Sequence, residues 1–182
     1  MAPEIDRPNT ALLVIDVQRD VVAAAHDRDG VISRMNRVID KARAAGAPVI
    51  WVQHDDEGLA RDTDGWQMVD ELVPLAGDAR VYKNFRDSFE LTSLEDELAA
   101  KDVGTLVVVG AQTDFCVRWT LHSALDRGYG TVLVADGHTT DAESPSDMPS
   151  GAALIAHTNS IWASQEHPRH STAVVEAAEI RF

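Results

Sequence analysis

The chain has 182 residues, of which 45% are hydrophobic and 25% charged, as is ordinary for one soluble globular domain with a sizeable core. Thirty acidic residues against sixteen basic ones give a net charge of −14 without a lysine and arginine cluster, so we expect neither nucleic acid nor a membrane surface as a partner. A single cysteine excludes an internal disulfide and a cysteine-rich zinc site.

The N-terminal residues 1–6 lack the charged and apolar regions of a signal peptide. No apolar run approaches the ~20 residues of a membrane span. We therefore expect a single domain over residues 1–182 and a cytoplasmic location.

The first half of the chain alternates short apolar runs with helical spacing. The pattern predicts a strand over 11–15 that ends at Asp16, a helix through 32–42 stopped by Gly46 and Pro48, and a strand over 49–52. Residues 54–80 are polar, and we expect most of them to form a long connection outside the regular elements. Residues 81–82 then predict a short third strand.

The second half repeats this alternation. The predicted elements are a helix opened by a capping box at 92–95, a strand over 105–109, a helix that opens at Thr113 or Asp114 and ends near Gly128, a strand over 131–135, a loop over 136–149, a helix over 151–164 and a strand over 172–175. Wholly apolar strands that alternate with helices predict an α/β fold, with a mostly parallel central sheet in a Rossmann-like three-layer α/β/α arrangement.

Ligands in such folds bind at the carboxyl ends of the strands. Asp16 ends the first predicted strand, His54 and Lys83 follow the second and third, and Cys116 comes just after the fourth. The sequence therefore predicts that these four residues converge.

Cys116 falls where a helix is predicted to begin. Aligned N–H groups and the positive end of the helix dipole favour a thiolate there, and a thiolate is a nucleophile. A lone cysteine on a helix is also often a small buried core residue. Placement alone leaves both readings open.

Asp16 and Lys83 are candidate partners of such a thiol. A carboxylate at an apolar strand end has a raised pKa and can exchange protons near neutrality, although a helix cap or a salt bridge is the common alternative. Taken alone, Lys83 reads as a solvated lysine. Histidine is the usual base for a cysteine, but His122 lies six positions from Cys116, about 600° around the helix. His54 remains a candidate for lining the pocket, and we expect His138 to be structural.

Three segments resemble the signatures of the isochorismatase-like cysteine hydrolases, a superfamily that includes nicotinamidases, carbamoyl-sarcosine amidases and ureidoacrylate amidohydrolases. They are Asp16 in Ile-Asp-Val-Gln, Lys83 ahead of Asp-Ser-Phe, and residues 110–117, Gly-Ala-Gln-Thr-Asp-Phe-Cys-Val. The resemblance extends to residues 135–140. The cysteine segment is its most specific part.

The resemblance implies a catalytic triad of Asp16, Lys83 and Cys116. It also implies a cis peptide between Ala111 and Gln112, with the Gln112 and Cys116 N–H groups forming an oxyanion hole. The implied reaction cleaves a C–N bond of a small amide, ureido or carbamoyl compound through a thioester. Neither a cofactor nor a metal is expected, because the Asp-x-His metal motif of nicotinamidases is missing from residues 52–57. The cysteine argues against the vinyl-ether cleavage of true isochorismatases.

Candidate substrate-binding residues are Gln18, Trp51, His54 and Phe85, with Gln112 beside them. Trp51 and Phe85 are also typical core residues. Two other functions remain open, a Cys–His hydrolase that uses His54 and a non-catalytic small-molecule-binding module. Relatives are commonly homodimers or homotetramers, and Trp66, Trp119 and Trp162 are either interface anchors or core.

Overall fold

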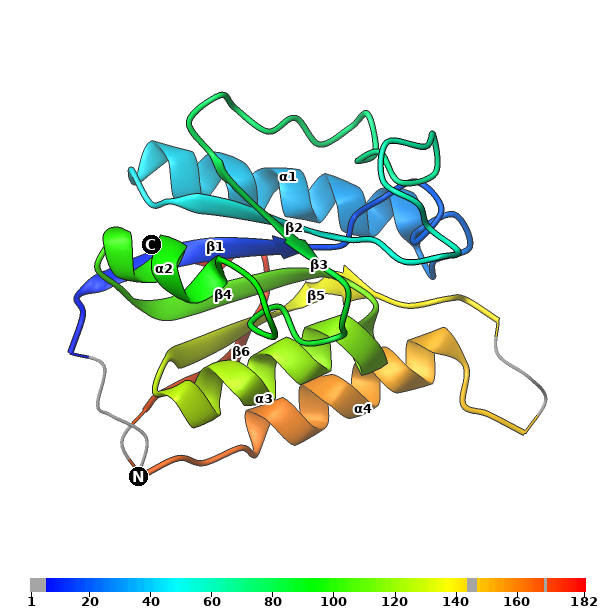
Figure 1. Ribbon diagram of the computed structural model, residues 1–182. Helices are drawn as coiled ribbons and strands as arrows, with labels where there is room; N and C mark the ends of the chain where they lie inside the picture. The colour runs from blue at the N-terminus through cyan, green and yellow to red at the C-terminus, as the bar shows by residue number, and fades with distance from the viewer. Residues whose placement is uncertain (1–5, 144–146, 169) are drawn as a thin grey trace.

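The computed structural model describes residues 6–143, 147–168 and 170–182 (Figure 1). The expectation about a signal peptide falls partly on residues 1–5, outside this range. The strands are β1 (Asn9–Ile15), β2 (Val49–His54), β3 (Ala79–Lys83), β4 (Val103–Ala111), β5 (Gly130–Thr139) and β6 (Thr172–Val175). The helices are α1 (Arg28–Ala44), α2 (Leu94–Ala100), α3 (Arg118–Arg127) and α4 (Gly151–Ala163), with a π-helix η1 (Thr113–Val117) leading into α3.

All the strands belong to one parallel sheet in the order β3-β2-β1-β4-β5-β6. The chain moves from β1 outward to β3, then crosses back to β4 beside β1 and continues to β6. The carboxyl ends of β1 and β4 therefore meet where the strand order reverses, which is the position at which parallel sheets bind ligands. The predicted α/β fold is confirmed.

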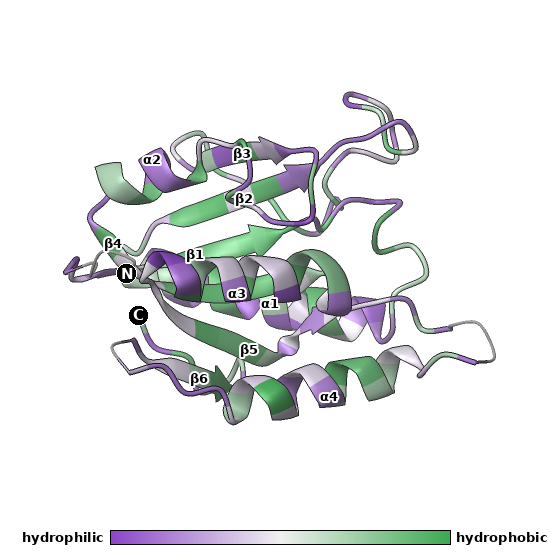
Figure 2. Ribbon diagram, turned by 60° about the horizontal axis from the view of Figure 1, so that its bottom comes forward, coloured by the Kyte–Doolittle hydropathy of each residue, from purple (hydrophilic) through white to green (hydrophobic). Residues whose placement is uncertain are grey.

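The sheet is covered on both faces, as wholly apolar strands require. Side chains from β1 alternate, so that Leu12 and Val14 pack in the cluster that includes α1, and Leu13 and Ile15 in the cluster that includes α2 and α3. Figure 1 shows α1 on one side of the sheet and α2, α3 and α4 on the other. Figure 2 shows apolar strands between helices whose hydropathy varies around their surface. None of the helices in the described ranges is long and apolar enough to cross a membrane.

Strand β5 is longer than the apolar run predicts. Its pairing with β4 shifts register between Val108 and Gly110, and then resumes with Gly110 opposite His138 and Ala111 opposite Thr139. The predicted loop over 136–149 is therefore wrong for residues 136–139, because a register shift lets polar residues rejoin the ladder. Residues 144–146 of that loop lie outside the described ranges.

The capping box predicted at 92–95 does not form. Thr92 Oγ1 accepts the Leu94 N–H at 3.2 Å, but Glu95 instead accepts a hydrogen bond from the Tyr129 hydroxyl at 2.7 Å. A tertiary contact takes the place of the local one, so α2 begins without the reciprocal bond.

Candidate active site

Asp16 follows the last residue of β1, and its side chain is almost fully buried at 1% exposure. Its backbone N–H donates to Val52 O at 2.9 Å, which extends the β1–β2 pairing by one residue. Its φ of 50° then turns the chain away from the sheet. The carboxylate is thereby held at the strand end.

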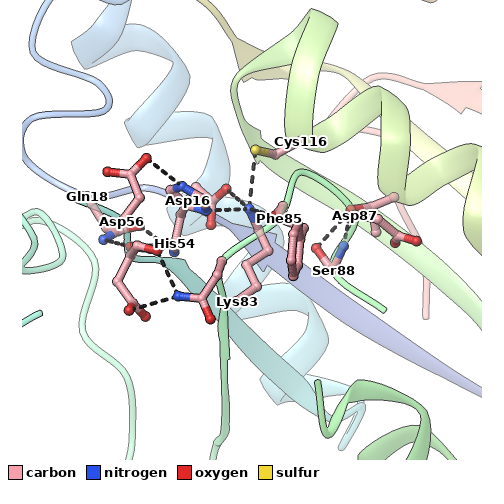
Figure 3. A network of polar contacts seen from close by, with 12 residues as sticks. Asp16, Gln18, His54, Asp56, Lys83, Phe85, Asp87, Ser88 and Cys116 are labelled. Carbon is pink, nitrogen blue, oxygen red and sulfur yellow. Dashed lines mark hydrogen bonds and ion pairs between the residues drawn. The ribbon is translucent and has the colours of Figure 1, made fainter. Parts of the chain in front are cut away.

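Lys83 is the last residue of β3, and its side chain is fully buried. Its Nζ lies 2.6 Å from Asp16 Oδ2 and donates to Cys116 Sγ at 3.2 Å (Figure 3). It also donates to Phe85 O at 3.1 Å. Burial alone would lower the pKa of Lys83, but the charge of Asp16 and then that of a Cys116 thiolate outweigh it and raise the pKa. Lys83 is therefore a buried ammonium that joins the carboxylate to the sulfur.

Cys116 lies in η1, immediately after β4, and its side chain is half-buried. Burial, followed by the negative charge of Asp16, raises the pKa of the thiol to about 12, although Lys83 acts in the opposite direction. The expectation of a thiolate at the helix start is therefore wrong for the resting site. Desolvation and a neighbouring carboxylate outweigh the end of a short helix, so the resting group is a thiol beside a base.

Asp16 and Cys116 line a cleft of about 460 Å³, together with Gln112 and other residues, whereas the fully buried Lys83 is not part of its lining. A second cavity of about 630 Å³ lies next to it. The residues that line both are His54, Asp56 and Arg86. The site is therefore an open depression at the carboxyl ends of the strands, with room for a small molecule beside the thiol.

His54 ends β2 and contacts the triad through Lys83. The Lys83 ammonium only donates, so the His54 Nδ1 at 3.4 Å accepts, and Nε2 then carries the proton toward Asp56 Oδ2 at 3.1 Å. Both ring nitrogens face partners other than the sulfur. This arrangement gives His54 a place in the cleft wall and no direct path to the thiol proton.

Gln18 and Trp51 do not line the cleft. The Gln18 side chain is buried, accepts the His54 N–H at 2.9 Å and donates to His54 O at 2.9 Å. It therefore holds the main chain of His54. Trp51 is fully buried in the core, where its Nε1 donates to Asp78 Oδ2 at 2.9 Å. The prediction that these two residues bind substrate is wrong, because both side chains are fully buried away from the cleft.

Phe85 and Gln112 lie at the site. Phe85 is 50% exposed and lines the second cavity. The peptide bond between Ala111 and Gln112 is cis, as expected. The Gln112 side chain lies at the cleft and donates to Asp141 Oδ1 at 2.9 Å.

Further residues of the cleft wall were missed from the sequence. They are Asp20, Asp56, Arg86, Phe115 and Asp141, among others. The Arg86 guanidinium lies 4.2 Å from the centroid of the Phe115 ring. Their only sequence signal is position, since each lies within a few residues of a strand end or of Cys116. Within the described residues, no group of three or more His, Cys, Asp or Glu side chains is arranged to hold a metal ion.

The tryptophans divide between core and surface. Trp66 and Trp162 are buried, and Trp119 is 52% exposed at the edge of the second cavity. His122 packs edge-on against Trp162 with ring centroids 5.2 Å apart. It therefore belongs to the contact between α3 and α4, away from the thiol.

Comparison with known proteins gives the family. The sequence model of one protein family, the isochorismatase domain, matches residues 10–150. A streptothricin hydrolase from Streptomyces noursei is 39% identical over 140 residues, which are 74% of this chain and 56% of that protein. The chain thus spans little more than half the length of that relative. The ureidoacrylate amidohydrolase RutB of Methylobacterium radiotolerans is 28% identical, and the match covers 88% of this chain and 78% of RutB.

The fold agrees with solved structures of the same family. A crystal structure of an isochorismatase family protein superimposes with a TM-score of 0.83 and 28% identity, covering 93% of this chain and 99% of that one. The family model covers well over half of the sequence, and the segments that it matches include Asp16, Lys83 and Cys116. The chain therefore belongs to the isochorismatase family.

Proposed function

We propose that this hydrolase cleaves a C–N bond of a small amide, ureido or carbamoyl compound through a Cys116 thioester. The observation that carries the proposal is the position of the buried Lys83 ammonium, 2.6 Å from Asp16 Oδ2 and 3.2 Å from Cys116 Sγ, because Asp16 and Cys116 both line an open cleft. The relatives named streptothricin hydrolase and ureidoacrylate amidohydrolase support hydrolysis of this bond class.

The first half of the reaction begins from the thiol. Asp16 accepts the thiol proton as the sulfur attacks the substrate carbonyl carbon, and the Lys83 ammonium offsets the charge that develops on sulfur. The backbone N–H groups of Gln112 and Cys116 hold the oxyanion, a type of contact worth ~3–4 kcal/mol in the transition state. When the C–N bond breaks, Asp16 returns the proton to the leaving amine and the acyl group remains on the sulfur.

The second half is hydrolysis of the thioester. Asp16 takes a proton from water as the water oxygen attacks the thioester carbon. The C–S bond then breaks, the acid leaves, and the proton returns to the sulfur. A raised thiol pKa suits this cycle, because the same thiol is restored at each turnover and a resting thiolate is not needed.

A substrate panel tests the proposal. Small amides, ureido acids and carbamoyl compounds are incubated with the enzyme, and release of amine or ammonia is measured. We expect turnover of at least one class, abolished in Cys116→Ala. Turnover that Cys116→Ala retains in full would contradict the nucleophile assignment.

We also propose that the protein works in the cytoplasm as a homodimer or homotetramer. Exposed apolar side chains on α3 and α4, Trp119 at 52% and Ile161 at 37%, support self-association. Sedimentation equilibrium of the wild type and of Trp119→Ser gives the test, because a monomeric wild type would contradict the proposal.

A further inference from the structure

Three consecutive residues of the turn that carries the nucleophile are each held by a side-chain contact from the end of β5 and the residues after it. The pairs are Gln112 Nε2 to Asp141 Oδ1 at 2.9 Å, Thr113 Oγ1 to His138 Nδ1 at 2.8 Å, and Thr140 Oγ1 to Asp114 Oδ1 at 2.9 Å. Backbone pairing of β4 with β5 ends just before them, at Ala111 opposite Thr139. These side-chain contacts therefore tie residues 112–114 to the end of β5 after the backbone pairing of β4 has stopped.

The central pair is the most deeply buried. Thr113 is 0% exposed and His138 is 1% exposed. Thr113 lies directly after Gln112 and three residues before Cys116, and the Gln112 carbonyl accepts N–H bonds from Phe115 and Val117. A shift of Thr113 would therefore move both the sulfur and the backbone N–H groups that are proposed to hold the oxyanion.

The hydrogen positions of this pair follow from its neighbours. Asn159 of α4 donates its amide Nδ2 to Ala135 O at 2.8 Å, so its Oδ1 faces His138 Nε2 at 2.9 Å as an acceptor. His138 Nε2 must then carry the proton. Burial lowers the pKa of His138, so the ring is neutral and Nδ1 accepts the Thr113 hydroxyl proton. The chain of donors is thereby fixed from Thr113 to Ala135.

We propose that His138, fixed in one tautomer by Asn159, is a positioning residue that holds the nucleophile turn through Thr113. The inference rests on the proposed function, since the turn is held for attack by Cys116. His138 does not touch the reacting atoms. It acts by keeping the sulfur beside Asp16 and Lys83. A small displacement of a reacting group, even when a mutation far from the chemistry causes it, can lower the rate up to ~100-fold.

The variants isolate one hydrogen bond. Thr113→Val keeps the shape and removes the donor, whereas Thr113→Ser keeps the donor. Asn159→Leu removes the acceptor that fixes the tautomer, from a half-buried position on α4. Thr131→Val is the matched control, because Thr131 is a fully buried threonine of β5 whose Oγ1 has no hydrogen-bond partner among the described residues.

Two measurements are made on each variant. The first is kcat and KM on a substrate found in the panel. The second is the rate at which iodoacetamide alkylates the protein between about pH 7 and 10, a range that spans the ordinary thiol pKa of ~8.5. Cys116 is the only cysteine of the chain, so alkylation reports this position alone. The second measurement does not depend on turnover, so it tests the positioning role even if the proposed function fails.

We expect Thr113→Val to lower kcat about tenfold or more and to leave KM within about twofold of wild type. The reason is that substrate binding is unchanged, whereas attack by the Cys116 sulfur is slowed. A looser turn lets water reach the sulfur, so its alkylation profile should level off at a lower pH than that of wild type. Thr113→Ser should restore both properties, and Thr131→Val should change neither.

Wild-type kcat and alkylation profile in Thr113→Val would overturn the proposal, as would an equal loss in Thr113→Ser. If Thr113→Val does not fold, Asn159→Leu decides. It should shift kcat and the alkylation profile in the same directions, and wild-type values of both would overturn the proposal.

Discussion

The Lys83 ammonium lies 2.6 Å from Asp16 Oδ2, and neither side chain is more than 1% exposed. Asp16 Oδ1 has no hydrogen-bond partner among the described residues. The carboxylate is therefore neutralised on one side and has a free acceptor on the other. This is the electrostatic state that a proton acceptor for Cys116 requires, because the ammonium compensates the charge of a buried carboxylate.

Lys83→Met should both abolish activity and destabilise the fold. Removing one partner of a buried ion pair leaves an uncompensated charge and typically costs ~3–5 kcal/mol. The double variant Asp16→Asn with Lys83→Met removes both charges, so it should recover most of the stability without recovering turnover. Urea unfolding and the activity assay measure the two effects, and a fully active Lys83→Met would remove Lys83 from the triad.

Asp16→Asn should be a slower enzyme than His54→Ala. Loss of a general base costs ~10²–10⁴ in rate, whereas His54 faces Lys83 and Asp56 and should affect kcat less than about tenfold. The two variants are compared by kcat, after circular dichroism has shown that both are folded. The reverse order of rates would support a Cys–His hydrolase instead.

Cys116 should make the fold less stable as the pH rises through the alkaline range. Its folded pKa of about 12 lies above the unfolded value of ~8.5, so the unfolded chain loses its proton first. Stability from the buried thiol is full below pH ~8.5 and declines between there and about 12, by at most ~1.4 kcal/mol for each pH unit.

Comparison with Cys116→Ala measures this contribution. Tyr129, whose pKa is also raised by burial, adds a decline of the same sign, but it cancels in the difference between the two proteins. From about pH 8.5 upward, the unfolding free energy of the wild type should fall relative to that of Cys116→Ala. Parallel curves would show that the thiol titrates normally. Slow alkylation at neutral pH would accordingly not identify a non-catalytic binding module, because the raised pKa already predicts it.

Gly110→Ala should disrupt the junction of β1 and β4. Gly110 has a φ of +130°, and a Cβ there would lie 2.1 Å from Ile15 O, next to Asp16. Backbone strain and overpacking together should cost more than ~2 kcal/mol. Gly77→Ala is the control, because a Cβ there meets nothing within 4 Å. Thermal unfolding of the two variants measures the effect, and we expect a lower melting temperature for Gly110→Ala than for Gly77→Ala. Equal melting temperatures would refute the steric argument.

Much of the fold was predictable because its strands are apolar on both faces. Runs at 11–15, 105–109 and 131–135 that are apolar apart from Thr105 and Thr131 predicted parallel strands with Asp16 and Cys116 near their ends, and the structure brings Asp16, Lys83 and Cys116 together as expected. The polar end of β5 was not predictable, because a register shift pairs residues 138–139 without any apolar signal.

The chemistry of individual side chains was harder to predict. Helix-start placement favours a thiolate at Cys116, but burial and a carboxylate from β1 depend on tertiary distances that the sequence does not contain. Gln18, a candidate substrate-binding residue by sequence, lies two residues from Asp16, yet it turns inward to hold His54. Nearness in sequence to a catalytic residue does not fix the direction of a side chain.

The thioester is the central claim, and intact-protein mass spectrometry tests it most directly. Wild type and Cys116→Ala are mixed with a turned-over substrate and quenched in acid within the first turnovers. The account predicts an added mass equal to the acyl fragment on the wild type, located on the peptide that contains Cys116 and removed by hydroxylamine, with no addition to Cys116→Ala. Two results would contradict the thioester account. One is full turnover without any acylated enzyme, under conditions where acylation is faster than hydrolysis of the acyl-enzyme. The other is an adduct on a residue other than Cys116.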